Sequence, residues 1–134
     1  MMETMVQVNE FDRVFYDAQR QGRLSFYFTN RGEEAQAVGS AAALEPEDWV
    51  WPQYRELGCA FWRGWTFQEV AHQLCATAED PAHGRQLPLH IGSAKLHILY
   101  VKSTLGTQCP HAAGVAYGMK QRREATVAIT YFGE

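Results

Sequence analysis

The chain has 134 residues, of which 46% are apolar and 20% charged, a composition that excludes a disordered tail and fits one domain of ordinary size. Twelve basic and fifteen acidic residues give a net charge of −3, so no basic excess exists to neutralise a phosphate backbone, and we expect no nucleic-acid partner. No apolar run approaches the roughly 18 residues that a membrane helix needs, so we expect no membrane partner either.

The first half of the chain is predicted to be mainly helical. Apolar residues recur at spacings of three and four over residues 4–21, the pattern of an amphipathic helix, and a glycine follows as a natural stop. A second helix is expected over residues 32–44, where small side chains cover nearly every side and predict close burial. The sequence WVW at 49–51 predicts a short strand, and residues 56–62 a further helix.

The second half alternates helices with strands. A capping-box signature predicts a helix over residues 67–77, and the prolines and glycine of residues 78–90 predict a long loop. HILYV at 97–101 is predicted as a strand and residues 108–122 as a helix with a proline in its first turn. ATVAITYF at 125–132 is nearly all apolar or β-branched and predicts a strand buried on both faces.

This order of strand, helix and strand is a βαβ unit, which implies an α/β fold with a parallel sheet. The last strand reaches Phe132, and the chain ends two residues later at Glu134. Ligands of α/β proteins bind at the carboxyl ends of the strands. We therefore expect residues 1–134 to be the N-terminal part of one larger domain, truncated where a binding site begins.

The residues that could carry chemistry give few signals by themselves. The five histidines show no close metal-ligand spacing, and no phosphate-binding glycine motif or nucleophile elbow occurs. Three widely spaced cysteines, Cys59, Cys75 and Cys109, predict free thiols in a reducing compartment.

Two segments are better candidates for a binding site. Tyr54 and Arg55 follow a short strand, where an arginine can bind a phosphate through two hydrogen bonds, although the residues alone favour an exposed arginine at a helix start. Residues 103–108 lie between a strand and a helix N-terminus, and Gly106 allows close approach of the backbone to a ligand. Alone, that segment is an ordinary βα loop.

The combination of five ordered segments is more specific. They are TNRGEEAQAVGSAAAL, QYRELG, GRQLPLH, STLGTQCPHAAGVAYGMK and YFGE. Together they resemble the alpha subunit of the thiamine diphosphate-dependent branched-chain 2-oxo acid dehydrogenase, from about residue 10 to the end of the chain. GEEA, QLPLH and the opening of a Gly-Glu-type motif favour this family over the related pyruvate dehydrogenase alpha subunit.

The resemblance implies a three-layer α/β/α thiamine diphosphate-binding fold with a parallel sheet, incomplete in this chain. It implies that Tyr54 and Arg55 bind the cofactor diphosphate. It also implies that Ser103 and Leu105 line the aminopyrimidine side, largely through backbone groups. The role of His90 stays open.

The resemblance further implies two metal sites. Glu134 matches a magnesium ligand, whereas Thr107 and Gln108 match ligands of a structural potassium ion. Relatives usually carry a hydroxyl residue where this chain has Lys102. We therefore expect either that the Lys102 ammonium replaces potassium and bonds to Thr107 and Gln108, or that Lys102 points into solvent.

The implied activity is the oxidative decarboxylation of branched-chain 2-oxo acids, with transfer of the acyl group to a lipoyl carrier in branched-chain amino acid catabolism. The implied partners are the beta subunit, in a heterotetramer, and a lipoyl acyltransferase core. The location would be the mitochondrial matrix in a eukaryote and the cytoplasm in a bacterium.

Catalytic residues are not expected within this chain. In the family, the activating glutamate belongs to the beta subunit and the catalytic histidine lies beyond residue 134, so this segment alone should be inactive. A pyruvate- or acetoin-type alpha subunit remains an alternative. So does a non-catalytic remnant that keeps only the surface for subunit pairing.

Overall fold

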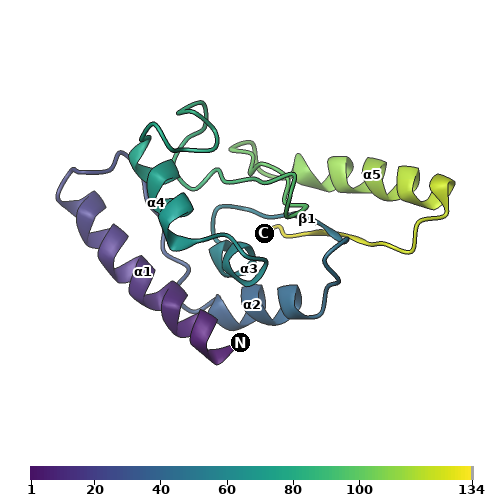
Figure 1. The fold of residues 1–134 in the computed structure, drawn as a ribbon, viewed down its shortest axis with the longest axis horizontal. Helices are drawn as coiled ribbons and strands as arrows, with labels where there is room; N and C mark the ends of the chain where they lie inside the picture. The colour runs from purple at the N-terminus through teal and green to yellow at the C-terminus, as the bar shows by residue number, and fades with distance from the viewer. Residues whose placement is uncertain (134) are drawn as a thin grey trace.

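The computed structural model describes residues 1–133, and its elements follow the predicted order with one strand fewer (Figure 1). Helices α1 and α2 meet near the N-terminus, α3 and α4 lie against them, and α5 extends away from this group. The elements are α1 (Met2–Arg20), α2 (Glu34–Ala42), β1 (Trp49–Trp51), α3 (Leu57–Trp62), α4 (Phe67–Cys75), α5 (Gln108–Arg122) and β2 (Ala128–Thr130).

Helix α1 packs its predicted apolar face against α3 and α4. Val8 and Phe11 are buried on this face, and the Phe11 ring meets the Phe61 ring edge to face at a centroid distance of 5.3 Å. Phe67 of α4 completes the cluster at 4.4 Å from Phe61. The period of three to four residues is therefore confirmed as the core-facing stripe of α1.

Helix α2 is less buried than we expect from the small side chains on nearly every side of it. Ala37, Val38 and Ala41 are buried, whereas Ala35 and Gln36 are exposed. Small side chains permit close packing on any side, but the neighbours of α2 are mainly α1 and α3, with one further contact from Ser40 to the Tyr131 hydroxyl at 2.6 Å.

The sheet is parallel, as expected, but its strands pair differently. β1 pairs in parallel with β2 in the register Trp49 to Ala128. On its other side, Val50 of β1 forms a single parallel bridge with Ile98. β1 therefore lies between the two segments that the predicted βαβ unit would have joined directly.

The strand expected at residues 97–101 is wrong. Ile98 makes only isolated bridges, one to Val50 and one to Ser93. His97 adopts a left-handed conformation with a φ of 52°, which ends the extended backbone immediately before Ile98. A turn thus replaces the first part of the strand.

The strand expected at residues 125–132 is present but shorter and less covered. Its regular part is β2, whose three residues are all half-buried. Val127 and Phe132 on either side are 52% and 69% exposed, so the expectation of burial on both faces is wrong for the described residues.

The other predicted elements are confirmed. Helix α4 begins with a complete capping box, in which the Thr66 side chain accepts from the Glu69 backbone and the Glu69 carboxylate accepts from Thr66. Residues 78–90 form a long loop without regular structure. Helix α5 ends with Lys120 and Arg122 in its last turn, where positive charge complements the helix dipole.

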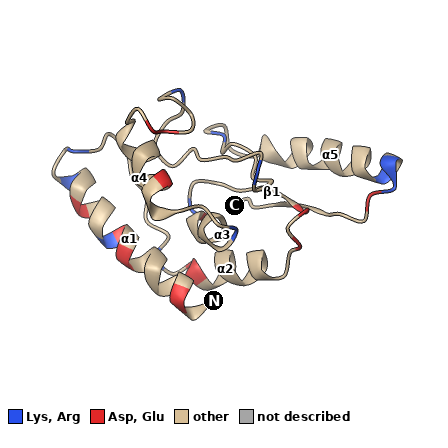
Figure 2. Ribbon diagram, viewed as in Figure 1, with Lys and Arg blue, Asp and Glu red and all other residues tan. Residues whose placement is uncertain are grey.

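Charged residues are distributed unevenly over these elements (Figure 2). Acidic residues lie along α1, and basic residues gather at the outer end of α5. Within residues 1–133, no helix is both long enough and apolar enough to cross a bilayer.

The segments around Gly92 and Tyr100 approach each other so closely that only glycine fits between them. An added Cβ at Gly92 would lie 2.6 Å from the Cα of Tyr100. The neighbouring Val101 N–H donates to the Ile91 carbonyl at 3.0 Å. Gly92 is therefore needed for contact between the two segments.

We expect Gly92→Ala to lower the free energy of unfolding by about 2 kcal/mol, because the new methyl group displaces the backbone of Tyr100. The matched control is Gly39→Ala in α2, where an added Cβ meets nothing within 4 Å. That variant should be stabilised by about 0.5 to 1 kcal/mol, since alanine favours the helix. Urea denaturation measures both, and an equal effect of the two substitutions would contradict the close approach.

Candidate functional site

A cleft of about 560 Å³ opens at the carboxyl ends of β1 and β2. Its walls come from four segments far apart in sequence: the start of α2, the turn after β1, the loop before α5 with the first turn of that helix, and the residues that follow β2. Tyr54, Arg55 and Leu105 line it, together with Gly106 and Phe132. The structure thus places three of the predicted site residues in one cleft, where α/β proteins bind ligands.

Arg55 is the cation of this cleft. Its Nη1 donates to the Thr29 carbonyl at 2.9 Å, and its guanidinium lies 4.9 Å from the centre of the Phe28 ring. A guanidinium carries five N–H groups, and within the described residues only this one hydrogen bond engages them. Arg55 is therefore oriented by its neighbours and keeps donors for an anion.

Tyr54 stands beside Arg55 on an aromatic wall. The Tyr54 ring lies 5.3 Å from the Phe28 ring and 6.2 Å from the Phe26 ring, measured between centroids. These contacts hold the phenol in place, so that Tyr54 adds a neutral hydroxyl next to the cation.

The position of the Tyr54–Arg55 turn is fixed by a buried network that begins on α1. Both Asp12 carboxylate oxygens accept hydrogen bonds from Asn30, from its backbone N–H at 2.5 Å and from its side-chain amide at 2.8 Å. The Tyr27 hydroxyl also donates to Asp12, at 2.8 Å. The Asn30 side-chain oxygen in turn accepts from the backbone N–H of Leu57 at 3.1 Å, at the start of α3.

Glu56 supports the same turn from inside. Its carboxylate accepts the backbone N–H of Gln53 at 2.6 Å, and the side chain is buried at the edge of the cleft. Burial raises the pKa of Glu56, and the nearby charge of Glu33 adds to this effect, while the Gln53 hydrogen bond and Arg55 oppose it. The cleft of Arg55 therefore contains two acids, Glu33 and Glu56, and the buried one, Glu56, has a reduced tendency to ionise.

The loop before α5 places its predicted residues in different surroundings. Leu105 is 66% exposed at the cleft, and the Ser103 hydroxyl lies 2.6 Å from His90 Nε2. The Thr107 hydroxyl donates to the Thr104 carbonyl at 2.7 Å and gives no capping bond to α5. The Gln108 side-chain amide donates to the Tyr131 carbonyl at 2.8 Å.

Lys102 does not take the place of a bound ion in this structure. Its side chain is exposed, and the hydrogen bonds of Thr107 and Gln108 within residues 1–133 run to Thr104 and Tyr131 instead. The expectation that the Lys102 ammonium bonds to both residues is therefore not met. Glu134, predicted as a magnesium ligand, lies outside the described residues.

Sequence reasoning missed several residues of the site. Asp12 and Asn30 carry no local signal, because the hydrogen bonds between them join residues 18 positions apart. Glu56 and Cys109 also line the cleft, and Cys109 could have been found from its place in the first turn of the helix after the glycine-containing loop. Across residues 1–133, no group of three or more His, Cys, Asp or Glu side chains could hold a metal ion.

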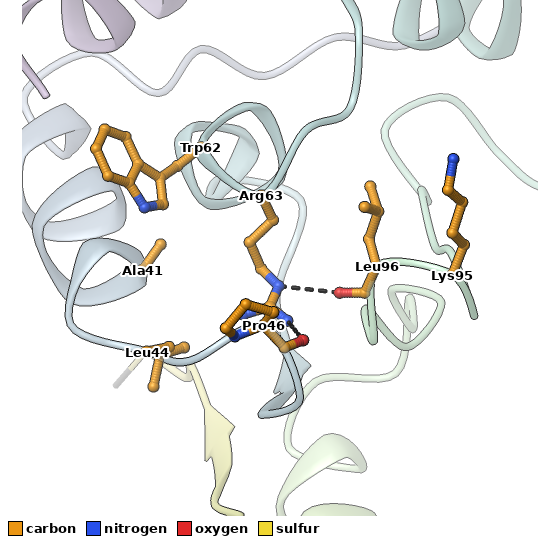
Figure 3. A pocket seen from close by; sticks show the side chains of 7 residues that line it. All are labelled: Ala41, Leu44, Pro46, Trp62, Arg63, Lys95 and Leu96. Carbon is orange, nitrogen blue, oxygen red and sulfur yellow. Dashed lines mark hydrogen bonds between the residues drawn. The ribbon is translucent and has the colours of Figure 1, made fainter.

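A second hollow, of about 230 Å³, also contains an arginine but lacks a free donor set (Figure 3). Arg63 donates through Nε to the Leu96 carbonyl at 2.9 Å, and its two other nitrogens donate to carbonyls of residues 45, 46 and 48. Four of its five N–H groups are thus engaged. Arg63 therefore holds the end of α3 against two loops, and it keeps too few free donors to bind an anion in this hollow.

Comparisons with known proteins agree on one family. The dehydrogenase E1 component family matches residues 2–134. The chain is 47% identical over 135 residues to the mitochondrial 2-oxoisovalerate dehydrogenase subunit alpha of Caenorhabditis elegans, covering 100% of this chain and 31% of that protein. It is 51% identical over 130 residues to subunit alpha 2 of Arabidopsis thaliana, covering 97% and 28%.

The human mitochondrial subunit alpha is 43% identical over 134 residues, which cover 100% of this chain and 30% of the human protein. The chain therefore spans about three tenths of the length of the curated relatives that it matches.

We expect Asp12→Ala to lower the free energy of unfolding by about 3 kcal/mol, because it leaves buried donors of Tyr27 and Asn30 without an acceptor. Asp17→Ala, an exposed position on the same helix, is the control and should change stability by less than about 0.5 kcal/mol. Urea denaturation measures both variants. Equal midpoints would show that Asp12 does not anchor the Asn30 segment.

The raised pKa of Glu56 predicts a pH dependence. Because the folded state binds this proton more tightly than the unfolded state, the stabilisation it gives is complete at low pH and is lost as pH rises through the folded-state pKa. Glu56→Gln should therefore gain stability relative to the wild type as pH rises above the ordinary titration range of a carboxyl group, because the amide carries no charge that burial would penalise. Exposed Glu47→Gln is the control, with denaturation midpoints as the measurement. Parallel pH profiles for Glu56→Gln and the wild type would contradict the raised pKa.

Proposed function

Because the chain belongs to the dehydrogenase E1 component family, we propose that it forms part of the alpha subunit of a branched-chain 2-oxo acid dehydrogenase. The proposed activity is the oxidative decarboxylation of branched-chain 2-oxo acids, with the acyl group passed to a lipoyl carrier. Relatives from animals, plants and Dictyostelium carry the name 2-oxoisovalerate dehydrogenase subunit alpha, which supports this substrate class. The carrying observation is the cleft that unites Tyr54, Arg55 and Leu105.

The residues present fit thiamine diphosphate. Arg55 is held in orientation by Thr29 and Phe28, so its remaining N–H groups can bind a diphosphate through charge-assisted hydrogen bonds. The Tyr54 hydroxyl offers a further donor, and Gly106, with a φ of 83° and no atom within 4 Å of an added Cβ, leaves the backbone open to a ligand. When bound, the cofactor supplies the group that stabilises the carbanion left by loss of carbon dioxide.

Metal ions belong to the same proposal. Glu134 is proposed as a magnesium ligand, because magnesium, a hard cation, prefers carboxylate and phosphate oxygens. Thr107 and Gln108 are proposed to bind potassium through oxygen. Their protons are engaged by the carbonyls of Thr104 and Tyr131, so the hydroxyl lone pairs and the amide oxygen remain for a cation. Lys102 is left out of this site.

The proposed partners are a beta subunit, which completes a heterotetramer, and a lipoyl acyltransferase core. The relatives named above are mitochondrial proteins, so the mitochondrial matrix is the proposed location if the source is a eukaryote. Ser103 is proposed to line the aminopyrimidine side of the cofactor together with Leu105.

Substrate competition tests the function in the alpha subunit that carries this segment, assembled with its beta subunit. Release of carbon dioxide is measured with 3-methyl-2-oxobutanoate and with pyruvate as substrates. We expect kcat/KM to favour the branched substrate by about tenfold or more, the discrimination that one or two methyl groups allow. A preference for pyruvate would assign the chain to the pyruvate type, and no decarboxylation of either acid would reject the function.

We expect Arg55→Ala to weaken thiamine diphosphate binding about tenfold to hundredfold, the loss typical of a charge-assisted hydrogen bond. Arg55→Lys should be intermediate, because an ammonium keeps the charge but cannot pair with two oxygens at once. Arg31→Ala, at an exposed position outside the cleft, is the control and should bind like the wild type. Isothermal titration with cofactor and magnesium measures all three. Unchanged affinity in Arg55→Ala would remove the diphosphate role.

A further inference from the structure

His90 lies beside the candidate cleft, between Ser103 and the Tyr54 ring, although neither His90 nor Ser103 is among the residues that line that cleft. The imidazole is buried, with 5% of the residue exposed, in the loop that precedes the Ser103 segment. Its Nε2 lies 2.6 Å from the Ser103 hydroxyl, and its ring centre lies 6.5 Å from that of Tyr54. One side chain thus contacts the loop before α5 and stands against the aromatic wall of the cleft.

The hydrogen bonds of His90 define its tautomer. Nδ1 lies 2.9 Å from the backbone carbonyl of Pro88, and a carbonyl can only accept. Nδ1 therefore carries the proton, which in the neutral imidazole leaves Nε2 as an acceptor. The Ser103 hydroxyl must then donate its proton to His90, so that its oxygen offers only lone pairs to anything else.

The backbone around His90 is held in an unusual conformation. Leu89, a buried non-glycine residue, has a φ of 65°, in the left-handed region that a bulky side chain rarely adopts. The buried amide of Gln73 on α4 maintains it, since Gln73 accepts the Leu89 N–H at 3.0 Å and donates to the Leu87 carbonyl at 2.7 Å. Such maintained strain is characteristic of functional positions.

The segment that carries Ser103 is also held in place by its neighbours. The Val101 N–H donates to the Ile91 carbonyl at 3.0 Å, one residue after His90 in one segment and two residues before Ser103 in the other. Gly92 admits the backbone of Tyr100 at a distance that no Cβ would permit. The contact between His90 and Ser103 is therefore built from both sides rather than left to two mobile side chains.

We infer that His90 is a positioning residue of the cofactor site, which orients the Ser103 hydroxyl as a hydrogen-bond acceptor for an N–H group of the bound cofactor. This inference rests on the proposed function. An acceptor hydroxyl suits the amino group of an aminopyrimidine and does not suit a diphosphate oxygen, which needs donors such as Arg55. His90 acts through Ser103 and through packing on Tyr54, without a proton transfer of its own.

The test compares variants of the assembled alpha–beta enzyme. His90→Phe keeps the ring but removes both nitrogens, whereas His90→Gln keeps a side-chain oxygen within reach of the hydroxyl. We expect His90→Phe and Ser103→Ala each to weaken thiamine diphosphate binding about tenfold. The double variant should bind at most about twofold more weakly than either single variant, because the two residues act through one hydrogen bond. His90→Gln should stay within about threefold of the wild type.

His97→Phe is the matched control. Like His90, His97 directs Nδ1 to a proline carbonyl, that of Pro46 at 3.1 Å, but no hydroxyl pairs with its ring within the described residues. It should leave cofactor affinity within about twofold. A tenfold loss in His97→Phe as well would reduce the His90 effect to general destabilisation and overturn the inference.

Inorganic diphosphate separates the roles of the two ends of the site. Competition by this probe should weaken in Arg55→Ala and stay unchanged in His90→Phe and Ser103→Ala, and KM for the 2-oxo acid should not change in the last two. Additive losses in the double variant, or equal loss of diphosphate binding in His90→Phe, would overturn the inference. A wild-type enzyme that binds no thiamine diphosphate would instead reject the proposed function.

Discussion

The carboxylate of Asp12 is the constraint on which the candidate site depends. It lies on α1, far in sequence from the cleft, yet it accepts both hydrogen bonds that fix Asn30, and Asn30 fixes the start of α3 through Leu57. The Tyr54–Arg55 turn is the short link between β1 and α3, so both of its ends are held. The carbonyl of Thr29, next to Asn30, then receives Arg55 itself. Helix α1 therefore orients the cation of the cleft without touching it.

Hydrogen bonds from a few buried side chains also order the long irregular segment between α4 and α5. Asp80 is buried and accepts the backbone N–H groups of Ala82 and Gly84, which closes the first part of the loop. Gln73 uses both ends of its amide on the next part. Buried backbone N–H and C=O groups need hydrogen-bond partners. In this segment, Asp80 and Gln73 supply the hydrogen bonds that the backbone of a helix or strand would otherwise make. The segment can thus present His90 and Ser103 at fixed positions without a strand.

Elements with local signals could be predicted from the sequence, and elements set by distant contacts could not. The capping box of Thr66 and Glu69 and the apolar period of α1 are written in neighbouring residues, and both helices formed as expected. The strand expected at 97–101 failed because a left-handed His97 and the turn after Ser93 depend on tertiary contacts. The central place of β1 likewise follows from pairing across nearly 80 residues, which no local pattern encodes.

In the cleft, the resemblance predicts which residues belong to the site, whereas the structure shows how they are arranged. The resemblance implies that Tyr54, Arg55 and Leu105 share one site, although their spacing of about fifty residues gives no distance between them. The structure brings the three residues to one cleft. What the resemblance did not supply is the direction of the hydrogen bonds. Arg55 can only donate, and Ser103, if His90 orients it, can only accept. A ligand with an anionic group at one end and an N–H donor at the other then fits in a single orientation. The reversed ligand would place its anionic oxygens against the Ser103 oxygen, acceptor against acceptor, and would leave the Arg55 guanidinium without an anion.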